Sequence, residues 1–481
     1  MPCGNQVDSV FLAMNRPRQT KIIATLGPAT DAPETIRALI DAGADIFRLN
    51  MSHARHDWAR RVAGHIREMA GQKPIAILAD LQGPAIRTGV VDEPFQLEQG
   101  QQFTFTTDDR EPGSRSVGVN YPGLADDVSP GDTILIDNGL ISMKVLEEKT
   151  GAIECEVLIG GEMGSRRHIN LPGVKVNLPA LTEKDRADIQ CVLDIGVDFM
   201  ALSFVREAKD IAELRDAVAA AKHPPRLVAK IEDQYAIKHL DPIIEVSDVI
   251  MIARGDLGVE CPYEELPIIQ RRIAKLCQQR GCPVIVATQM LESMIEAPYP
   301  TRAEVTDVAN AVYEQADAIM LSGEISVGKY PRNCIEVADR IARRIERSGG
   351  ANFHKAAHLE CPRGKLANSA VRMADDLEAN ALIVFTREGR LVPEAAWMRP
   401  RQAPILALCL SQTVARSLTM HRAVRPVVMP WDEVNQAVAI DRALKELTSQ
   451  NHLASGDTVV VISSVLAVES IADSIQMRVV D

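Results

Sequence analysis

Eight apolar, strand-like runs set before helical patterns are the feature of this sequence that most constrains its fold. They cover residues 21–25, 44–50, 74–80, 199–204, 226–232, 249–255, 283–288 and 318–323. Eight parallel strands close a (β/α)8 barrel, and the right-handed crossover rule makes a closed barrel the simplest arrangement of repeated βα units. The sequence therefore predicts an α/β protein built on a TIM barrel, with its chemistry at the carboxyl ends of the strands.

Two further segments interrupt and follow the barrel pattern. Residues 88–177 contain alternating runs and turn signals such as NYPG and SPGD, which predict a small inserted β-barrel domain. Residues 351–481 return to strand and helix patterns and predict a separate C-terminal α/β domain. We assign the barrel to 20–87 and 178–350 and leave 1–19 as an N-terminal segment, a division that suits a chain of 481 residues.

Composition narrows the class of protein. The chain has 53 basic and 65 acidic residues, a net charge of −12, which argues against nucleic acid as a partner. No run approaches the length of a membrane span, and the first residues lack the pattern of a signal peptide, so we expect a cytoplasmic protein. Nine scattered cysteines suggest reduced thiols, and Cys277 and Cys282 suit packing better than metal binding.

Polar residues follow the second and third strand-like runs. In FRLNMSH, Arg48, Asn50 and Ser52 are spaced two apart, so an extended segment turns them to one face. Arg48 offers a planar fork for phosphate, while Asn50 and Ser52 offer neutral oxygens to a hard monovalent cation. Asp80 ends the third strand and would complete that cation site, with Arg87 facing phosphate at the junction with the insertion. A barrel strand that simply ends in a polar loop is the alternative.

The run AKIED places a cation beside a metal ligand. Lys230 and Glu232 are two residues apart and share one face of a strand. Further on, Gly255 and Gly258 bracket Asp256 in a turn whose amides can approach an anion. Two carboxylates with substrate oxygens and water suit Mg²⁺, so we assign Glu232 and Asp256 to it. The alternatives are ordinary salt bridges for the carboxylates and a surface-reaching lysine for Lys230.

The blocks RLNMSH, DLQGPAIRTG, INLPG, LTEKD, KIE, ARGDLG, ATQMLESM and LSGE, in this order, resemble the pyruvate kinase family over almost the whole chain. The resemblance implies a phosphotransferase that moves a phosphoryl group from phosphoenolpyruvate to ADP, giving pyruvate and ATP in glycolysis. It implies Mg²⁺ or Mn²⁺ as a cofactor, with K⁺ as a second one, and a homotetramer. No residue of the sequence by itself demonstrates a subunit interface.

The same resemblance implies roles for individual residues. Lys230, Arg48 and Thr288 are expected to be catalytic, and the substrate is expected to contact Arg48, Lys230, Gly255, Asp256 and Thr288. ADP is assigned to Asn50, His53, Arg87 and Arg167, and K⁺ to Asn50, Ser52, Asp80 and the backbone oxygen of Leu81. Thr288 is expected to help relay the proton that converts enolpyruvate to pyruvate. A lone threonine at a strand end would otherwise cap the next helix.

The sequence departs from the family pattern at several of these positions. Ala85 stands where potassium-dependent members carry Glu and potassium-independent members carry Lys, which leaves the monovalent-cation requirement open. Asp233 replaces a usual Asn. In the loop SRRHINLPG, Arg167 replaces a lysine that reaches the nucleotide, and His168 replaces a glycine.

The C-terminal domain of this family often binds a sugar phosphate, but the corresponding segments here differ. Glu388 and Leu391 stand where hydroxyl groups would hold phosphate, and 463–474 lacks glycine-rich basic character. We therefore expect no activation by fructose 1,6-bisphosphate, because Glu388 would repel it. The arginines of the region either serve another phosphorylated effector or form a solvated basic face; they are Arg387, Arg390, Arg399 and Arg401.

Two rival functions share some of these residues. A metal-enolate lyase on a related barrel would keep the carboxylate pair but needs neither the inserted domain nor the nucleotide loop. A non-catalytic metabolite sensor would keep the fold and is expected to have lost Lys230 or a metal carboxylate, and neither is lost. The sequence leaves the preferred nucleotide, the effector and the proton donor open.

Overall fold

A computed structural model of the chain describes residues 17–107, 115–431, 436–467 and 470–481. Side chains are described for all of these except 436–437, 464–467 and 470–472. Most of the N-terminal segment and much of the 463–474 segment, for which the sequence raised expectations, thus lie outside the described residues or side chains. Among the helices that are described, none is long and apolar enough to cross a membrane.

The eight predicted strands form a closed parallel barrel in the order β1-β16-β15-β14-β13-β12-β3-β2. This confirms the predicted TIM barrel, and every strand lies where an apolar run was found. The strands are β1 (Lys21–Thr25), β2 (Ile46–Asn50), β3 (Ala76–Asp80), β12 (Phe199–Leu202), β13 (Arg226–Ile231), β14 (Val249–Ala253), β15 (Val284–Ala287) and β16 (Ala318–Leu321).

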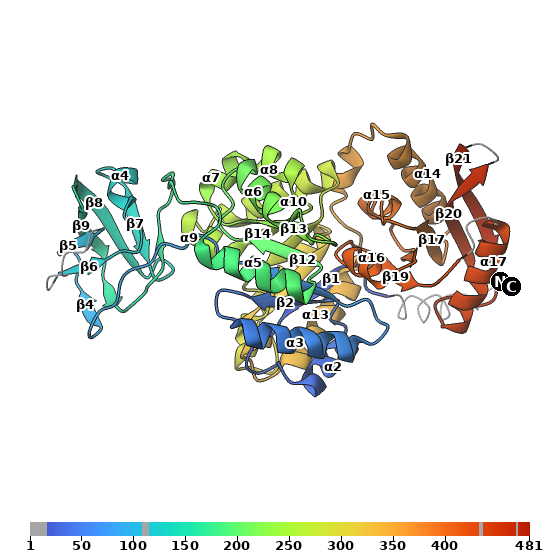
Figure 1. Cartoon of the computed structure of the whole chain (residues 1–481), viewed down its shortest axis with the longest axis horizontal. Helices are drawn as coiled ribbons and strands as arrows, with labels where there is room; N and C mark the ends of the chain where they lie inside the picture. Colours follow the sequence, from blue (N-terminus) through green and yellow to red (C-terminus); the bar gives the residue numbers. More distant parts are fainter. Residues whose placement is uncertain (1–16, 108–114, 432–435, 468–469) are drawn as a thin grey trace, which may run out of the picture.

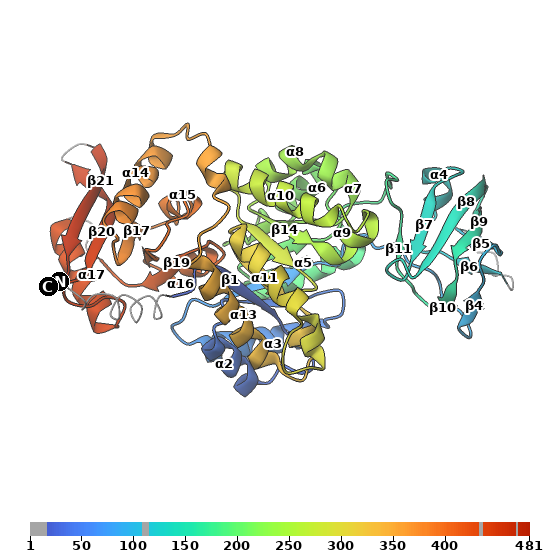
Figure 2. The same cartoon turned by 180° about the vertical axis from the view of Figure 1, so that it is seen from behind.

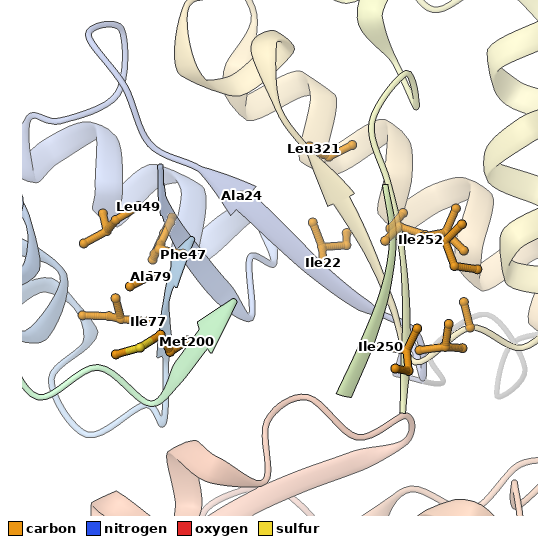
Figure 3. Close-up of a cluster of buried hydrophobic side chains, with 14 of the residues drawn as sticks. Ile22, Ala24, Phe47, Leu49, Ile77, Ala79, Met200, Ile250, Ile252 and Leu321 are labelled. Atoms are coloured by element: carbon orange, nitrogen blue, oxygen red, sulfur yellow. The ribbon is translucent and has the colours of Figure 1, made fainter. Parts of the chain in front are cut away.

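Alternation along the barrel strands separates two apolar layers. Side chains such as Ile22, Phe47 and Ile250 point outward and pack against the surrounding helices (Figure 3). The intervening residues, Ile23 and Met251 among them, fill the barrel interior. Because both faces of each strand are buried, the runs read as continuously apolar, as is typical of parallel sheets.

Helices surround the barrel, and three of them, α5, α6 and α11, begin at a capping box. Thr182 and Asp185 cap α5, and Thr301 and Glu304 cap α11, each side chain accepting from the backbone of the other. The barrel helices are α2 (Pro33–Ala42), α3 (His56–Ala70), α5 (Glu183–Ile195), α6 (Ala208–Val218), α7 (Gln234–Lys238), α8 (Leu240–Val246), α9 (Arg254–Glu260), α10 (Leu266–Arg280), α11 (Arg302–Tyr313), α12 (Gly323–Ser326) and α13 (Pro331–Glu346), with the 3₁₀ turn η1 (Glu292–Ile295).

The segment between β3 and α5, called the insertion below, is almost entirely β structure. It contains β4 (Phe95–Leu97), β5 (Gln102–Thr106), β6 (Ser116–Gly118), α4 (Leu124–Asp127), β7 (Thr133–Ile136), β8 (Ile141–Lys149), β9 (Ala152–Ile159), β10 (Gly161–Met163) and β11 (Ile169–Asn170). The described strands form a six-stranded and a two-stranded sheet. Residues 87–88 join the two edges of the larger sheet, because Arg87 bridges to His168 beside β11 and Thr88 bridges to Val119 beside β6. The insertion is therefore the small β barrel that the sequence predicts, with β9 and β10 separated at Gly160, where a Cβ would lie 2.2 Å from the oxygen of Leu97.

The C-terminal domain is an open α/β sheet with strand order β19-β18-β17-β20-β21, in which β21 alone is antiparallel to its neighbour. Separate apolar clusters cover its two faces. Its elements are η2 (Phe353–Ala356), α14 (Pro362–Asp376), β17 (Ala381–Thr386), α15 (Leu391–Trp397), β18 (Ile405–Cys409), α16 (Gln412–Ser417), β19 (Val424–Val428), α17 (Gln436–Ser449), β20 (Thr458–Ala467) and β21 (Ser470–Val479).

The insertion and the C-terminal domain lie at opposite ends of the barrel (Figures 1 and 2). On the C-terminal side, Arg399 donates two hydrogen bonds of 2.7 and 2.6 Å to Asp317, the residue before β16. Arg399 therefore fits neither of the two roles considered for it, a phosphorylated-effector site or a solvated basic face, because its side chain is buried and its charge is neutralised across the domain contact. The carboxyl ends of the strands are left facing the insertion.

Candidate active site

Four polar side chains lie above the apolar residues of the barrel interior, at the carboxyl ends of the strands. Arg48, Asp80, Ser203 and Lys230 each lie two residues beyond an interior position, namely Ile46, Leu78, Ala201 and Val228. Strand alternation therefore turns them into the barrel rather than toward the helices. The chain thus places a charged layer directly on top of an apolar one.

Asp80 is the centre of this charged layer. Its carboxylate accepts from Arg48 Nε at 2.7 Å and lies 3.4 Å from Lys230 Nζ. Burial alone would raise the pKa of Asp80, but Lys230 and Arg48 outweigh it, and the pKa is lowered. Thr25 accepts from the same guanidinium at 3.2 Å. The arginine fork is therefore fixed from two sides at the barrel mouth.

Lys230 links the second carboxylate to this layer. Its ammonium lies 2.9 Å from Glu232 Oε1 and donates to Ser203 Oγ at 2.6 Å. Burial lowers the pKa of Lys230, yet Asp80 and Glu232 reverse that effect, so the net shift is upward and the side chain stays charged. The other oxygen of Glu232 accepts from the backbone N–H of Phe204 at 2.7 Å. Phe204 has φ of 56°, a strained value for a bulky residue of the kind found at functional sites.

Asp256, on α9, is the other predicted metal carboxylate. Burial and the neighbouring charge of Asp80 raise the pKa of Asp256, although Lys230 acts in the opposite direction. Burial and the charge of Asp256 likewise raise the pKa of Glu232. His168 of the insertion lies 3.8 Å from Asp256, and its ring is 5.6 Å from that of Phe204. Burial and Arg87 lower the pKa of His168 to about 4, so this imidazole is neutral near pH 7.

The donor set around Glu232 and Asp256 fits a small divalent cation. Both carboxylates are destabilised in their charged form by burial and by neighbouring carboxylates, a state that a bound cation relieves. In the part of the chain that the structure describes, no three His, Cys, Asp or Glu side chains form a complete metal cage. Two protein carboxylates completed by substrate oxygens and water are the arrangement that Mg²⁺ prefers.

Thr288 does not cap a following helix, which was the alternative to a functional role. Its hydroxyl donates to the oxygen of Ala287 at 2.6 Å and accepts from the backbone N–H of Gly255 at 2.8 Å. Its φ of 67° is a genuine outlier for a β-branched residue. Arg254 fixes this turn, because its guanidinium donates to the oxygen of Thr288 and to Asp307. The backbone N–H of Gly255, a residue predicted to contact the substrate, thus lies against the Thr288 side chain.

The predicted monovalent-cation ligands lie on two adjacent loops after β2 and β3. Asn50 pairs in register with Asp80, and the Asn50 side-chain oxygen accepts from the Ser52 backbone at 3.2 Å. The oxygen of Leu81 accepts from Ser203 Oγ at 2.8 Å. Asp80 Oδ1 is buried and accepts no hydrogen bond that meets ordinary geometry among the described residues, and the Lys230 ammonium faces it at 3.4 Å. His53, in the same loop, is exposed.

The predicted nucleotide arginines meet where the insertion joins the barrel. Arg87 pairs with His168 in an isolated antiparallel bridge, and Arg87 donates to the oxygen of Arg166 at 3.1 Å. The guanidinium of Arg167 pairs with Asp137 of the insertion at 3.1 Å. The outgoing linker turns at Gly83, where φ is 67° and an added Cβ would lie 2.7 Å from the oxygen of Ser203, so a side chain is excluded.

Three residues that contact the candidate site or the insertion beside it were not identified by the sequence analysis. Ser203 binds Lys230, and its signal was a hydroxyl at the end of the strand-like run FMALSF. Arg254 fixes Thr288, but no local pattern distinguishes it from a surface arginine. Glu260 accepts from the backbone of Leu171 at 3.2 Å, a contact between residues 89 positions apart that local spacing does not encode.

In the C-terminal domain, the predicted effector segment forms a tight turn. Thr386 Oγ1 accepts from the backbone of Gly389 at 2.8 Å, and Arg390 pairs with Glu388 at 2.6 Å. Arg401 pairs with Asp375 at 3.3 Å and remains two-thirds exposed. Of the four arginines considered for a phosphorylated effector, Arg399 alone is withdrawn into the domain contact.

The fold is a TIM barrel with cationic side chains and two carboxylates at its mouth, a β insertion beside that mouth and an α/β domain behind it. These features together define a barrel phosphotransferase. Family models described as "Pyruvate kinase, barrel domain" and "Pyruvate kinase, alpha/beta domain" match residues 17–335 and 364–475. The chain therefore belongs to the pyruvate kinase family.

Individual relatives agree with this assignment. A pyruvate kinase of Methylorubrum extorquens is 41% identical over 94% of this chain and 95% of its own length. Pyruvate kinase 2 of Synechocystis is 39% identical over 96% of this chain and 80% of its own length. A crystal structure of a pyruvate kinase from Cryptosporidium parvum superposes with a TM-score of 0.91 at 34% identity, covering 96% of each chain.

Proposed function

We propose that this protein transfers the phosphoryl group of phosphoenolpyruvate to ADP in the presence of Mg²⁺, giving pyruvate and ATP. The observation that carries the proposal is the placement of Lys230 against both Asp80 and Glu232, with Arg48 on the same carboxylate. This arrangement puts two fixed cations beside a divalent-metal site at the barrel mouth. A transferring phosphoryl group carries charge on several oxygens and needs such stabilisation.

The reaction breaks the bond between phosphorus and the enol oxygen and forms a bond from phosphorus to a terminal oxygen of ADP. Arg48 and Lys230 bind and orient the phosphoryl group, because their side chains are held by buried carboxylates and lose little freedom on binding. Glu232 and Asp256 would hold Mg²⁺, which supplies positive charge to the phosphoryl oxygens when bound. The enolate of pyruvate remains and takes a proton on its methylene carbon.

Thr288 is the proposed residue on the proton path. Its hydroxyl is fixed between Ala287 and Gly255 and lies on the turn that precedes η1. Strained backbone of this kind is found at functional sites, and the hydroxyl satisfies an N–H in the first turn of α9 instead of capping a helix that follows it. Arg87 and Arg167, with Asn50 and His53, are the proposed contacts for ADP, and the insertion is the proposed lid that excludes water.

The decisive experiment is pyruvate formation from phosphoenolpyruvate and ADP with Mg²⁺, followed through lactate dehydrogenase. We expect turnover by the natural protein and its loss in Lys230→Met, with Lys209→Met as the matched control because Lys209 is 73% exposed. Circular dichroism confirms that each variant is folded. No pyruvate from the folded natural protein, or equal activity of the two lysine variants, would refute the proposal.

We further propose that the protein assembles into a homotetramer. Support comes from exposed aromatic and aliphatic side chains on α10 and on the segments after α9 and η1, where Tyr263 is 85%, Ile268 62% and Tyr299 75% exposed in a single chain. Large apolar side chains with this exposure are candidates for an association surface. Light scattering coupled to size-exclusion chromatography measures the assembly mass, and a monomeric mass at micromolar concentration contradicts this proposal.

A further inference from the structure

Glu260, the last residue of α9, contacts two separate segments next to the proposed active site. Its Oε1 accepts from the backbone N–H of Leu171 at 3.2 Å, and the side chain of Asn170 also bonds to it. Its backbone oxygen accepts from the side chain of Gln234, which begins α7 two residues after Glu232. The Glu260 carboxyl is itself buried, with 7% of the residue exposed.

The Leu171 contact joins two different apolar cores. The side chain of Leu171 belongs to the core of the insertion, together with Ile169. Leu257 of α9 and the adjacent Cys261 belong to the cluster between the barrel and its helices. A movement of the insertion core therefore displaces the Leu171 amide, and Glu260 transmits that displacement to α9.

Helix α9 also carries Asp256, one helical turn before Glu260. We propose that Glu260 is a positioning residue that ties the returning strand of the insertion to α9, so that the lid and the carboxylate of Asp256 are placed together. The proposal rests on the proposed function, in which the insertion closes over the substrates and Asp256 holds the divalent cation.

A second anchor on the same linker offers an internal comparison. Arg206, 8% exposed, donates to the backbone oxygens of Val176 and Leu178 at 3.0 and 2.7 Å. These contacts do not involve Glu260. Loss of the Glu260 side chain should release residues 169–173 and leave 176–178 held by Arg206.

The test is hydrogen–deuterium exchange of the full chain, resolved by peptide, on Glu260→Ala, Glu260→Asp and Glu260→Gln. The matched control is Glu264→Ala, an exposed glutamate four residues further along. In Glu260→Ala and Glu260→Asp we expect exchange at 169–173 to rise about tenfold, the scale of one lost hydrogen bond, with 176–178 unchanged. Glu260→Gln keeps an oxygen that accepts from Leu171 and should retain protection. Should Glu260→Ala fail to fold, the shortened Glu260→Asp, which keeps a carboxyl group, decides.

Kinetics test the functional half of the inference. We expect Glu260→Ala and Glu260→Asp to lower kcat about tenfold through a misplaced lid, with binding of phosphoenolpyruvate alone unchanged and activity rescued in Glu260→Gln. Equal exchange at 169–173 in Glu260→Ala, Glu260→Asp and Glu264→Ala would show that Glu260 does not hold this segment to α9. Increased exchange with unaltered kcat would show that Glu260 holds the segment but has no positioning role in catalysis. A natural protein that forms no pyruvate would refute the proposed function, while the exchange pattern would still decide whether the tie exists.

Discussion

The ammonium of Lys230 lies 2.9 Å from the carboxylate of Glu232, two residues further along the same barrel strand. Because strand alternation sends both side chains into the barrel mouth, one short run supplies a fixed cation and a proposed metal ligand. Lys230 also holds Glu232 partly neutralised, while Phe204 fixes its other oxygen. The geometry of this carboxylate is therefore set before any ligand binds.

The first prediction concerns the charge of Glu232. Glu232→Gln keeps the shape of the side chain and the bond from Phe204 but removes one of two charges from the divalent site. We expect the Mg²⁺ concentration for half-maximal activity to rise at least about tenfold, since even outer-shell changes cost that much. Titrating Mg²⁺ in the coupled assay measures it, with Glu264→Gln, at an exposed glutamate, as control. An unchanged Mg²⁺ requirement would remove Glu232 from the metal site.

Ser203 is predicted to position Lys230. Its hydroxyl accepts from Lys230 and donates to the oxygen of Leu81, so Ser203→Ala leaves the ammonium with carboxylates alone. We expect kcat to fall about tenfold, the scale of one buried hydrogen bond to a charged group, with recovery in Ser203→Thr. Steady-state kinetics of both variants measure kcat, and thermal unfolding checks that their stability is unchanged. Equal kcat in the alanine and threonine variants argues against a positioning role.

The positions that could be predicted share a local cause. Arg48, Asp80, Lys230 and Glu232 follow apolar strands, and a period of two is enough to place their side chains at the barrel mouth. Ser203 also lies at the end of an apolar run and turns into the barrel mouth. It was not predicted because an uncharged hydroxyl at that position does not by itself indicate a site.

What could not be predicted depends on contacts between distant segments. Arg399 was considered for an effector site or a solvated basic face, yet Asp317, 82 positions away, neutralises it in the domain contact. The bond from Leu171 to Glu260 and the approach of His168 to Asp256 likewise exist only once the insertion folds back on the barrel.

Thr288 yields a prediction about proton transfer. Thr288→Val preserves volume but removes the acceptor of the Gly255 N–H, whereas Thr288→Ser keeps it. We expect the exchange of pyruvate methyl protons with D₂O, followed by NMR, to fall about a hundredfold in Thr288→Val, the lower end of general acid–base contributions. Thr288→Ser should retain most of it. Unaltered exchange in the valine variant would place the proton path elsewhere.

Ala85 leads to a prediction about monovalent cations. Ala85 supplies no ammonium to the loops that carry Asn50, Ser52 and Asp80, and its own oxygen accepts from Asn120 at 3.0 Å. We expect K⁺ to raise turnover relative to Na⁺ at equal ionic strength, and Ala85→Lys to abolish the difference by placing a fixed charge there. Ala85→Met, similar in length but uncharged, is the control. Equal turnover of the natural protein in both salts contradicts this prediction.

The last prediction concerns the contact that holds the C-terminal domain to the barrel. Asp317 receives two bonds from Arg399, one from the backbone of Arg422 at 3.1 Å and one from that of Val284 at 3.0 Å. Arg399→Met leaves that carboxylate buried without its cation, so we expect a loss of about 3–5 kcal/mol in the free energy of unfolding. Arg401→Met, at an exposed pair, should change it by less than about 1 kcal/mol.

The pH dependence of this loss separates the charge from side-chain volume. Burial raises the pKa of Asp317, but Arg399 and its hydrogen bonds outweigh it and lower the pKa in the folded protein. A lowered folded-state pKa means that the ion pair stabilises the protein above the ordinary carboxyl pKa, and that this stabilisation disappears as the pH falls through the folded value. The difference between the natural protein and Arg399→Met in urea unfolding should therefore be full at pH 7 and shrink on acidification. A difference that is independent of pH would attribute the loss to the missing side-chain volume instead of the ion pair.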